Sequence, residues 1–230
     1  MYKIETHIHT IHSSKCGHLT ADEIISAYKK EGYAGIAVTD HFNRATVAYL
    51  GMDLSEKNVE EKFFLGARMT QKAAREQGMI CYLGAEVRFD GSENDFLVYG
   101  FEPSLFADPE AVFTQGLAAF KKKCEKAGAI LIQAHPFRKG CDPSSAELLD
   151  GIEVFNLNLR HESHNGKALD YAKEHDLIMT AGSDCHRPYN VCQAGIISNS
   201  LPRDTFELAQ LLRSQDYLLF TKPERVEKRD

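Results

Sequence analysis

Apolar runs alternate with longer amphipathic segments along this chain of 230 residues. Apolar runs bounded by turn signals are typical of strands, and the most continuous ones of strands buried on both faces. They lie at 35–39, 79–87, 96–101, 129–134, 151–155, 177–181, 194–198 and 217–221. Helices are predicted at 20–30, 55–77, 109–127, 164–175 and 204–214. Strands and helices that alternate at this length predict a parallel sheet, either open or closed into a barrel.

Local signals mark where several of these elements begin and end. Thr20 and Glu23 have the spacing of a capping box, in which Thr20 caps the helix and the Glu23 side chain reaches back to it. Gly78 and Gly128 end two of the predicted helices. The Asp90-Gly91 turn signal predicts hairpin-like pairing of the strands on either side of it.

Hydrophobic residues make up 43% of the chain and charged residues 26%, as in a globular protein with one substantial core. No linker-like segment divides the sequence, so we expect a single domain over residues 1–230. The formal net charge of -6 provides no basic stripe, and we expect no duplex nucleic acid as a partner. No apolar run approaches membrane-spanning length, and we expect no membrane partner.

The chain contains six cysteines, and its first residues form no apolar leader. We therefore expect a cytoplasmic protein in which the cysteines are free thiols rather than disulfides. The sequence leaves the oligomeric state open.

Histidine and carboxylate side chains follow several of the predicted strands. Alternate side chains of a strand point to the same face, so His7 and His9 project together near the N-terminus. The set continues with His41, Glu86, His135, Asp184 and His186, and has His18, Asp40 and Asp95 as weaker members. The carboxyl ends of barrel strands open on one face, so we expect these side chains to converge in one pocket.

Imidazole and carboxylate donors without an evident thiolate cage suit Mn, Zn or Fe at a catalytic site with open positions. The donors exceed the needs of one ion, which predicts two or three divalent metal ions. Either Glu86 or Asp184 is expected to bridge a pair of ions, because a carboxylate offers two oxygens and an imidazole one free nitrogen.

Five motifs in this order resemble those of the PHP (polymerase and histidinol phosphatase) family of metal-dependent phosphoesterases. They are His7-Ile8-His9-Thr10, Thr39-Asp40-His41, Gly84-Ala85-Glu86, Ala134-His135-Pro136 and Gly182-Ser183-Asp184-Cys185-His186. The likeness extends from His7 to His186. It implies an α/β fold, a distorted (β/α)7 barrel, with a centre of two or three metal ions that hydrolyses phosphoesters.

The resemblance also implies three groups of ligands: His7, His9, Glu86 and Asp184 for one ion, Glu86 and His135 for a second, and His41 and His186 for a third. The third ion would take a further ligand from the loop at 11–19. In that loop Cys16-Gly17-His18 is similar to the Cys-Gly-His of histidinol phosphatase relatives, which favours His18 over His12.

Asp95 departs from the family pattern, because many relatives have a histidine at the start of this strand. A carboxylate at this position keeps a ligand and adds negative charge. It favours Mn or Fe over a cluster made of Zn alone.

The hypothesis that follows is hydrolysis of a small phosphate monoester by a metal-bound hydroxide, since divalent ions lower the pKa of a bound water from ~15.7 towards ~7. Asp184, His186 and His41 are the candidates for handling protons. The substrate phosphate also needs cationic donors, and the candidates are Arg138, Arg160, His161 and Arg187.

The sequence leaves three alternatives open. Histidinol phosphatase activity, and action on a nucleotide as a phosphatase or exonuclease, apply similar chemistry to other substrates. A metal-binding PHP module without catalysis belongs to a different class. Comparison of a phosphate monoester with a diester separates a monoesterase from a diesterase, and full metal occupancy without turnover identifies the metal-binding module.

Overall fold

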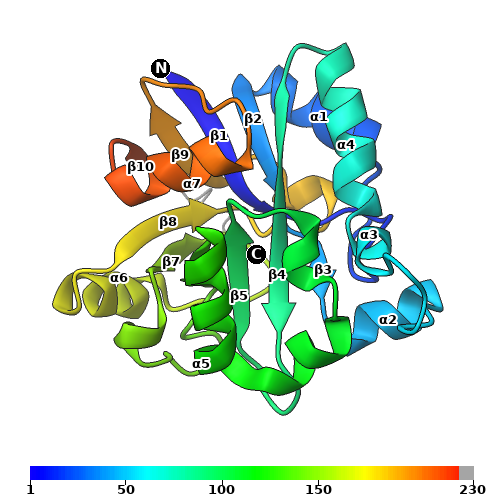
Figure 1. Cartoon of the computed structure of the whole chain (residues 1–230). Coiled ribbons are helices and arrows are strands. Elements are labelled where there is room, and N and C mark those ends of the chain that lie inside the picture. Colours follow the sequence, from blue (N-terminus) through cyan, green and yellow to red (C-terminus); the bar gives the residue numbers. More distant parts are fainter. Residues whose placement is uncertain (223–230) are drawn as a thin grey trace, which may run out of the picture.

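The strands form one sheet that curves into a nearly closed barrel (Figure 1). The structure is a computed structural model that describes residues 1–222. Its strands are β1 (Tyr2–Ile8), β2 (Tyr33–Val38), β3 (His41–Phe42), β4 (Ile80–Arg88), β5 (Asp95–Tyr99), β6 (Ile130–Gln133), β7 (Gly151–Asn156), β8 (Ile178–Gly182), β9 (Ala194–Ser198) and β10 (Leu218–Thr221). Residues 223–230, which the domain prediction includes, lie outside the described residues.

The strand order is β10-β9-β1-β2-β4-β5-β6-β7-β8, and β3 pairs with β4. The blocks β1-β2-β4 and β6-β7-β8 are parallel. A parallel bridge between Ile8 and Cys185 joins the end of β1 to the segment after β8 and nearly closes the sheet. The predicted distorted barrel is therefore confirmed.

Three strands depart from the expected parallel sheet, one of them, β5, in the predicted hairpin. β5 runs antiparallel to β4 and β6, and β9 and β10 also run antiparallel to their neighbours. The connection at 89–94 is too short for the crossover that a parallel pair requires, so β4 and β5 form the predicted hairpin. As a result, the start of β5 lies at the same edge as the ends of β4 and β6.

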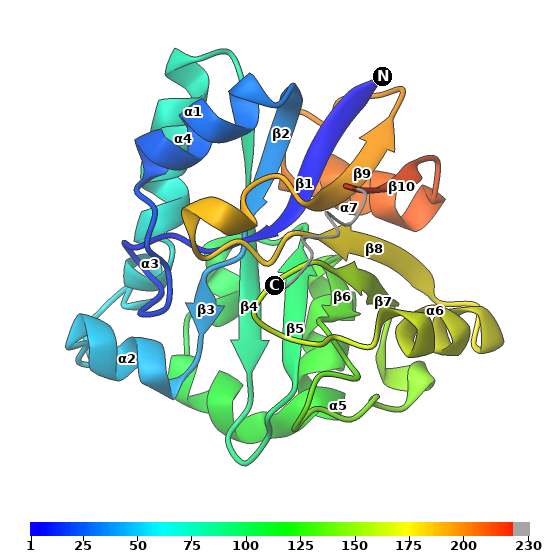
Figure 2. The ribbon, with the colours of Figure 1, turned by 180° about the vertical axis from the view of Figure 1, so that it is seen from behind.

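The α-helices of the described residues are α1 (Ala21–Lys30), α2 (Arg44–Leu50), α3 (Glu60–Phe63), α4 (Leu65–Glu76), α5 (Pro109–Ala127), α6 (Asn165–Glu174) and α7 (Thr205–Ser214). Short 3-10 helices lie at Pro103–Phe106, Ala146–Leu148 and Pro188–Asn190. Helices α1 and α4 lie side by side next to β2 and β4 (Figures 1 and 2). Within residues 1–222, no helix combines the length and the apolar character needed to cross a bilayer.

Two predicted helices are interrupted. The segment predicted as one helix over 55–77 contains α3 and α4, which are separated at Phe64, where ψ is 7°. Adjacent residues of a straight helix point about 100° apart, so the break helps the rings of Phe63 and Phe64 to enter one core. Gly116 interrupts α5 with a φ of 74°. The capping box of Thr20 and Glu23 is present as predicted.

A phenylalanine core holds β3 against β4. The Phe42 ring is fully buried and lies 4.0 Å from the Phe63 ring and 4.6 Å from the Phe106 ring, between centroids. Consecutive side chains of a strand point to opposite faces, so His41 faces away from this core. The register places His41 directly beside Glu86 of β4.

Candidate metal centre

The end of β1 places two imidazoles side by side. His7 and His9 are fully buried, and their Nε2 atoms lie 3.1 Å apart. Ile8 lies between them and packs in the core. The side chains of His7 and His9 therefore project from the same face of the strand, as predicted.

Glu86 lies at the centre of the cluster. Its Oε1 atom is 3.3 Å from Nε2 of both His7 and His135. Its Oε2 atom is 3.4 Å from Nε2 of His9 and 2.7 Å from Nδ1 of His41. Each oxygen of this carboxylate therefore faces a different pair of imidazoles.

Asp184 approaches the same imidazoles from the segment after β8. Its Oδ1 atom lies 3.6 Å from Nε2 of His7, 3.4 Å from Nε2 of His9 and 3.2 Å from Nδ1 of His186. Asp184 has a φ of 46°, and His135 has a φ of 30°. Left-handed backbone at a non-glycine residue is strained, and it persists only where the surrounding structure holds it in place.

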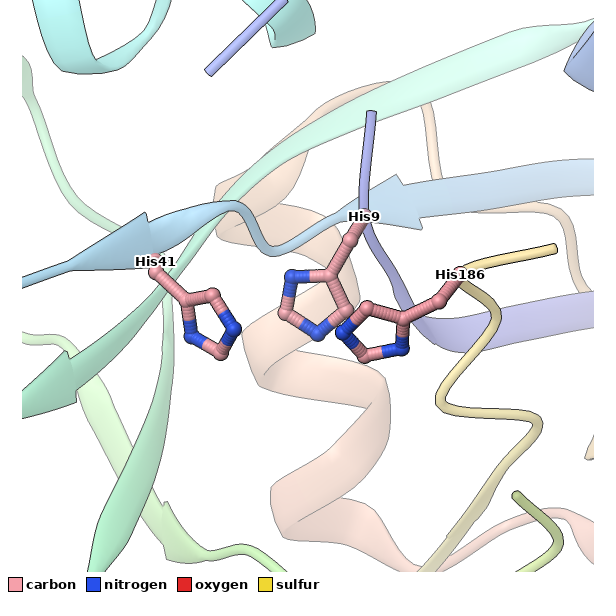
Figure 3. A group of neighbouring side chains, drawn as sticks. All are labelled: His9, His41 and His186. Atoms are coloured by element: carbon pink, nitrogen blue, oxygen red, sulfur yellow. The ribbon is translucent and has the colours of Figure 1, made fainter. Parts of the chain in front are cut away.

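The donor atoms form three sets, and the atoms within each set lie within 4.8 Å of one another. The sets are His9, His41 and His186; His7, His9 and Asp184; and His41, Glu86 and Asp95. Figure 3 shows the first set, whose rings come from the end of β1, from β3 and from the loop after β8. The ring centroids of His9 lie 4.3 Å from those of His41 and 4.2 Å from those of His186. Residues far apart in the sequence thus form one continuous donor cluster.

Two buried atoms of this cluster have no hydrogen-bond partner among residues 1–222. They are Nδ1 of His41 and Oε2 of Glu86, which lie 2.7 Å apart without a hydrogen-bonding orientation. A buried polar atom without a partner is costly unless something else satisfies it. Imidazole nitrogen and carboxylate oxygen are common ligands of Zn, Mn and Fe, so the residues present fit divalent metal ions.

The carboxylates raise the pKa of most imidazoles around them. Burial alone would lower the pKa of His7, but the neighbouring carboxylates, led by Glu153, raise it well above its usual range. Burial would also lower the pKa of His135 and of His186. Hydrogen bonds with Cys141 and Glu86 raise the pKa of His135 to about 9, and Asp184 raises the pKa of His186 to about 10. His9 is the exception, because burial and its imidazole neighbours hold its pKa well below the usual value.

Both central carboxylates stay ionised. Burial would raise the pKa of Glu86, but His41 and His7 hold it well below its usual range. Burial would also raise the pKa of Asp184, and here His7 and His186 hold it well below. Buried anions surrounded by imidazoles form a site in which a divalent ion can replace the protons.

Residues behind the cluster orient its rings. Glu153 Oε1 lies 2.9 Å from Nδ1 of His7, which leaves Nε2 of that ring facing the centre. Ser14 Oγ lies 3.4 Å from Nδ1 of His9 and donates a hydrogen bond of 2.7 Å to Asp40. Asp40, a weaker member of the predicted set, therefore supports the cluster from behind.

Sequence reasoning missed Glu153, although it carries a signal. Glu153 is a charged residue in the middle of the apolar strand β7 and is 1% exposed. A carboxylate buried in a strand needs a polar partner. Here the partners are His7, the backbone N–H of His135 and the side-chain amide of Asn156.

Among the predicted phosphate-binding residues, Arg138 contacts the cluster. Its Nη2 donates hydrogen bonds of 2.7 Å to Asp184 Oδ2 and 2.8 Å to Asn156 Oδ1. Arg160 and His161 are exposed and Arg187 is half-buried. Within residues 1–222, no side-chain hydrogen bond or ion pair joins these three to the donor cluster.

Two predicted ligands lie at the edge of the cluster. Asp95 is buried, with its Oδ2 atom 3.7 Å from Nε2 of His135, and it also forms a bidentate pair with Arg88. His18 is exposed, and its backbone N–H donates a hydrogen bond to the carbonyl of His186. Besides Ser14, the loop brings the side chain of Cys16 to the cluster, with Sγ 3.2 Å from Nε2 of His41. Burial would raise the pKa of this thiol, but His186 and His41 lower it to about 6.

The chain matches one protein family and is similar to several solved structures. The PHP domain family model matches residues 5–210 of the chain. No curated protein matches at a significant level. A two-domain protein from Bacteroides vulgatus ATCC 8482, which contains a predicted PHP-like metal-dependent phosphoesterase, matches with a TM-score of 0.70 at 16% identity, over 96% of this chain and 64% of that chain.

Two further structural neighbours are nucleases. The lesion-specific endonuclease PfuEndoQ from Pyrococcus furiosus has a TM-score of 0.61 at 14% identity, over 95% of this chain and 57% of that chain. Endonuclease Q in complex with a 27-mer duplex substrate has a TM-score of 0.58 at 14% identity, over 93% and 56%. This chain therefore spans less than two thirds of each of these three proteins, and such identities show a shared fold alone.

The exclusion of duplex nucleic acid from net charge is wrong. Endonuclease Q has the same fold and is bound to a duplex substrate. The formal net charge of -6 is a sum over the whole chain, whereas binding depends on the local field at one face. The overall charge therefore does not exclude a duplex partner.

Proposed function

Because this chain belongs to the PHP domain family, we propose that it is a metal-dependent hydrolase of small phosphate monoesters, with its ions held at the cluster around Glu86. The observation that carries the proposal is the position of the buried Glu86 carboxylate among four imidazoles. Its Oε1 atom lies 3.3 Å from Nε2 of both His7 and His135, and its Oε2 atom lies 3.4 Å from Nε2 of His9 and 2.7 Å from Nδ1 of His41. Within residues 1–222 the Oε2 atom has no hydrogen-bond partner, and a divalent ion would satisfy it.

Two or three ions, of Mn, Zn or Fe, fit the donor sets. His7, His9 and Asp184 would hold one ion together with Glu86. His135 and Asp95 would hold a second with Glu86, and His41 and His186 the third. Glu86 is the better bridging ligand, because both of its oxygens face imidazoles. Asp184 directs Oδ1 to the imidazoles and Oδ2 to Arg138.

When bound, divalent ions supply a nucleophile by lowering the pKa of water and neutralise the charge that develops on a phosphoryl group. The chain supplies the orientation. Glu153 and Ser14 direct the ring nitrogens of His7 and His9 towards the centre. Asp184, His186 and His41 are the groups that would accept and return protons at this edge of the barrel.

Arg138 is the residue that would bind the substrate phosphate. Its side chain is 16% exposed, so it is covered without being sealed from the rim. Its Nε atom is buried and has no hydrogen-bond partner in the described part of the chain. A guanidinium with a free donor beside the cluster matches the oxygens of a phosphate. Arg160, His161 and Arg187 would approach only from the surrounding loops.

The proposal is tested with metal-free protein reconstituted with Mn or Zn and assayed on p-nitrophenyl phosphate and on bis(p-nitrophenyl) phosphate. We expect hydrolysis of the monoester to be faster and to depend on added metal. Protein that binds these ions and cleaves neither ester, nor any of a panel of phosphorylated metabolites, would instead be a metal-binding module without catalysis.

Phosphodiester hydrolysis is the second candidate. The observation that favours it is the likeness to two structures of Endonuclease Q type, one of them with duplex substrate. A diester has one charge fewer than a monoester dianion and requires room for a second ester group. Faster cleavage of the bis ester, or of an oligonucleotide, would select this candidate over the first.

A further inference from the structure

The loop between β1 and α1 is fastened against the metal centre at several points. Its backbone closes on itself through the hydrogen bond from Ile11 N to the carbonyl of Leu19. The side chains of Thr10 and Ser14 both donate hydrogen bonds of 2.7 Å to Asp40. A Cβ at Gly17 would lie 2.3 Å from the carbonyl oxygen of Thr10, so only glycine allows this close turn.

The fold of this loop turns the side chain of Cys16 towards the metal centre and leaves the side chain of His18 exposed. The Sγ atom of Cys16 lies 3.2 Å from Nε2 of His41, and the thiol is half-buried. The neighbouring His18 uses its backbone N–H to bind the carbonyl of His186, while its side chain is exposed. The loop therefore presents a thiol, rather than an imidazole, to the donor group.

The group that Cys16 joins has unsatisfied donor capacity of its own. The imidazoles of His9, His41 and His186 form one donor set (Figure 3). The adjoining Glu86 carboxylate is 1% exposed and has an oxygen without a hydrogen-bond partner. These observations point to a cation at this end of the cluster independently of the cysteine.

We propose that Cys16, in place of His18, is the loop ligand of the ion held by His41 and His186. The inference rests on the metal centre of the proposed function. A thiolate is softer than an imidazole or a carboxylate, so this position would favour Zn, Fe or Co over Mn. The other positions of the cluster, with nitrogen and oxygen donors alone, would keep no such preference.

Co²⁺ is a suitable probe, because a thiolate bound to it gives a ligand-to-metal charge-transfer band in the near ultraviolet. Metal-free wild-type protein titrated with Co²⁺ is expected to show this band. Cys16→Ser should lose the band and bind one ion fewer per chain. His18→Ala and Cys141→Ser should retain it, and the second variant tests the other half-buried thiol, whose Sγ atom lies 3.9 Å from Nδ1 of His135.

A second measurement uses the wild-type chain and so does not depend on a variant folding. Bound Zn²⁺ should protect Cys16 from alkylation by iodoacetamide relative to metal-free protein, because a ligated thiolate is not a free nucleophile. The protection of Cys16 is compared with that of Cys141, whose Sγ atom lies 3.9 Å from Nδ1 of His135 and which is not proposed as a ligand. Mass spectrometry of the modified peptides reports the two sites separately.

The inference is overturned if Co²⁺ binds and supports hydrolysis but no charge-transfer band forms, or if the band survives in Cys16→Ser. It is equally overturned if His18→Ala removes one ion while Cys16→Ser does not. Those results leave the proposed function intact. Failure of the wild-type chain to bind Co²⁺, Zn²⁺ or Mn²⁺ would instead end both proposals.

Discussion

His41 Nδ1 and Glu86 Oε2 lie 2.7 Å apart on neighbouring strands, and within residues 1–222 neither atom has a hydrogen-bond partner. The register of β3 on β4 puts the two residues directly beside one another. Their side chains are 18% and 1% exposed, so bulk water does not satisfy them fully. The Glu86 carboxylate therefore keeps an oxygen that a metal ion can bind, and several consequences can be measured.

Removal of the central carboxylate should dismantle the metal centre. Glu86→Ala takes away both oxygens that face His7, His9, His41 and His135. We expect loss of bound metal and of phosphoester hydrolysis, measured by elemental analysis and by turnover. Glu162→Ala, at a side chain that is 76% exposed, is the matched control and should change neither. Full activity in Glu86→Ala would refute the assignment of this carboxylate.

Glu153 should act through His7 rather than by binding an ion itself. Its carboxylate accepts from Nδ1 of His7 at 2.9 Å and so sets which ring nitrogen faces the centre. Loss of such a supporting carboxylate lowers metal affinity by about 10–100-fold. Glu153→Gln should therefore need more Mn or Zn for half-maximal activity and recover turnover at excess metal. Unchanged metal affinity would show that the contact is only structural.

Metal binding should release protons. Without metal, burial opposes protonation, but nearby groups raise the pKa of His135 to about 9 and of His186 to about 10, so both rings are protonated at neutral pH. Metal ligation requires unprotonated nitrogen. Affinity should therefore increase as the pH rises from 7 towards 9.

Calorimetry in buffers of different ionisation enthalpy measures these protons directly. The expected result is an observed binding enthalpy that varies with the buffer at pH 7 and varies less at pH 9. Binding enthalpies that are identical in all buffers at pH 7 would show that these imidazoles are unprotonated before the ion arrives.

Arg138 should govern phosphate binding. A hydrogen bond to a charged group contributes about 1.5–3 kcal/mol, so Arg138→Ala should weaken inhibition by inorganic phosphate by about 10–100-fold. Arg68→Ala, whose side chain is 46% exposed, is the control. Arg138 also pairs with Asp184, so bound metal is measured in the same variant. Unchanged inhibition by phosphate at full metal occupancy would remove Arg138 from the substrate site.

Phe42 should be important for stability. Its ring is fully buried between Phe63 and Phe106, and truncation of a buried phenylalanine to alanine costs about 3–5 kcal/mol of unfolding free energy. Urea unfolding of metal-free Phe42→Ala measures this loss. A change below about 0.5 kcal/mol, the size of an ordinary surface substitution, would show that β3 is held by other contacts.

Much of the fold was predictable because buried strands leave continuous apolar runs in the sequence. The same runs located the strand ends, and hence the positions of His41, His135 and Asp184. The β4–β5 hairpin was also predictable from Asp90-Gly91. The two-residue β3 and the break at Phe64 were not, because tertiary packing of phenylalanine rings decides them.

The remaining misses have a common physical reason. Whether Cys16 or His18 faces the cluster depends on how a loop folds, and the loop is set by contacts with Asp40 and with the His186 carbonyl. The effect of Glu153 depends on which strand lies beside β1. The error on duplex nucleic acid arose because net charge says nothing of the local field at one face.

The most direct test of the metal centre is anomalous diffraction from crystals of the wild-type chain grown with Mn²⁺ or Zn²⁺. We predict two or three anomalous peaks inside the cluster, with both oxygens of Glu86 and Oδ1 of Asp184 among the ligands. Fully occupied ions bound elsewhere, or no peak among His7, His9, Glu86 and Asp184, would contradict the account.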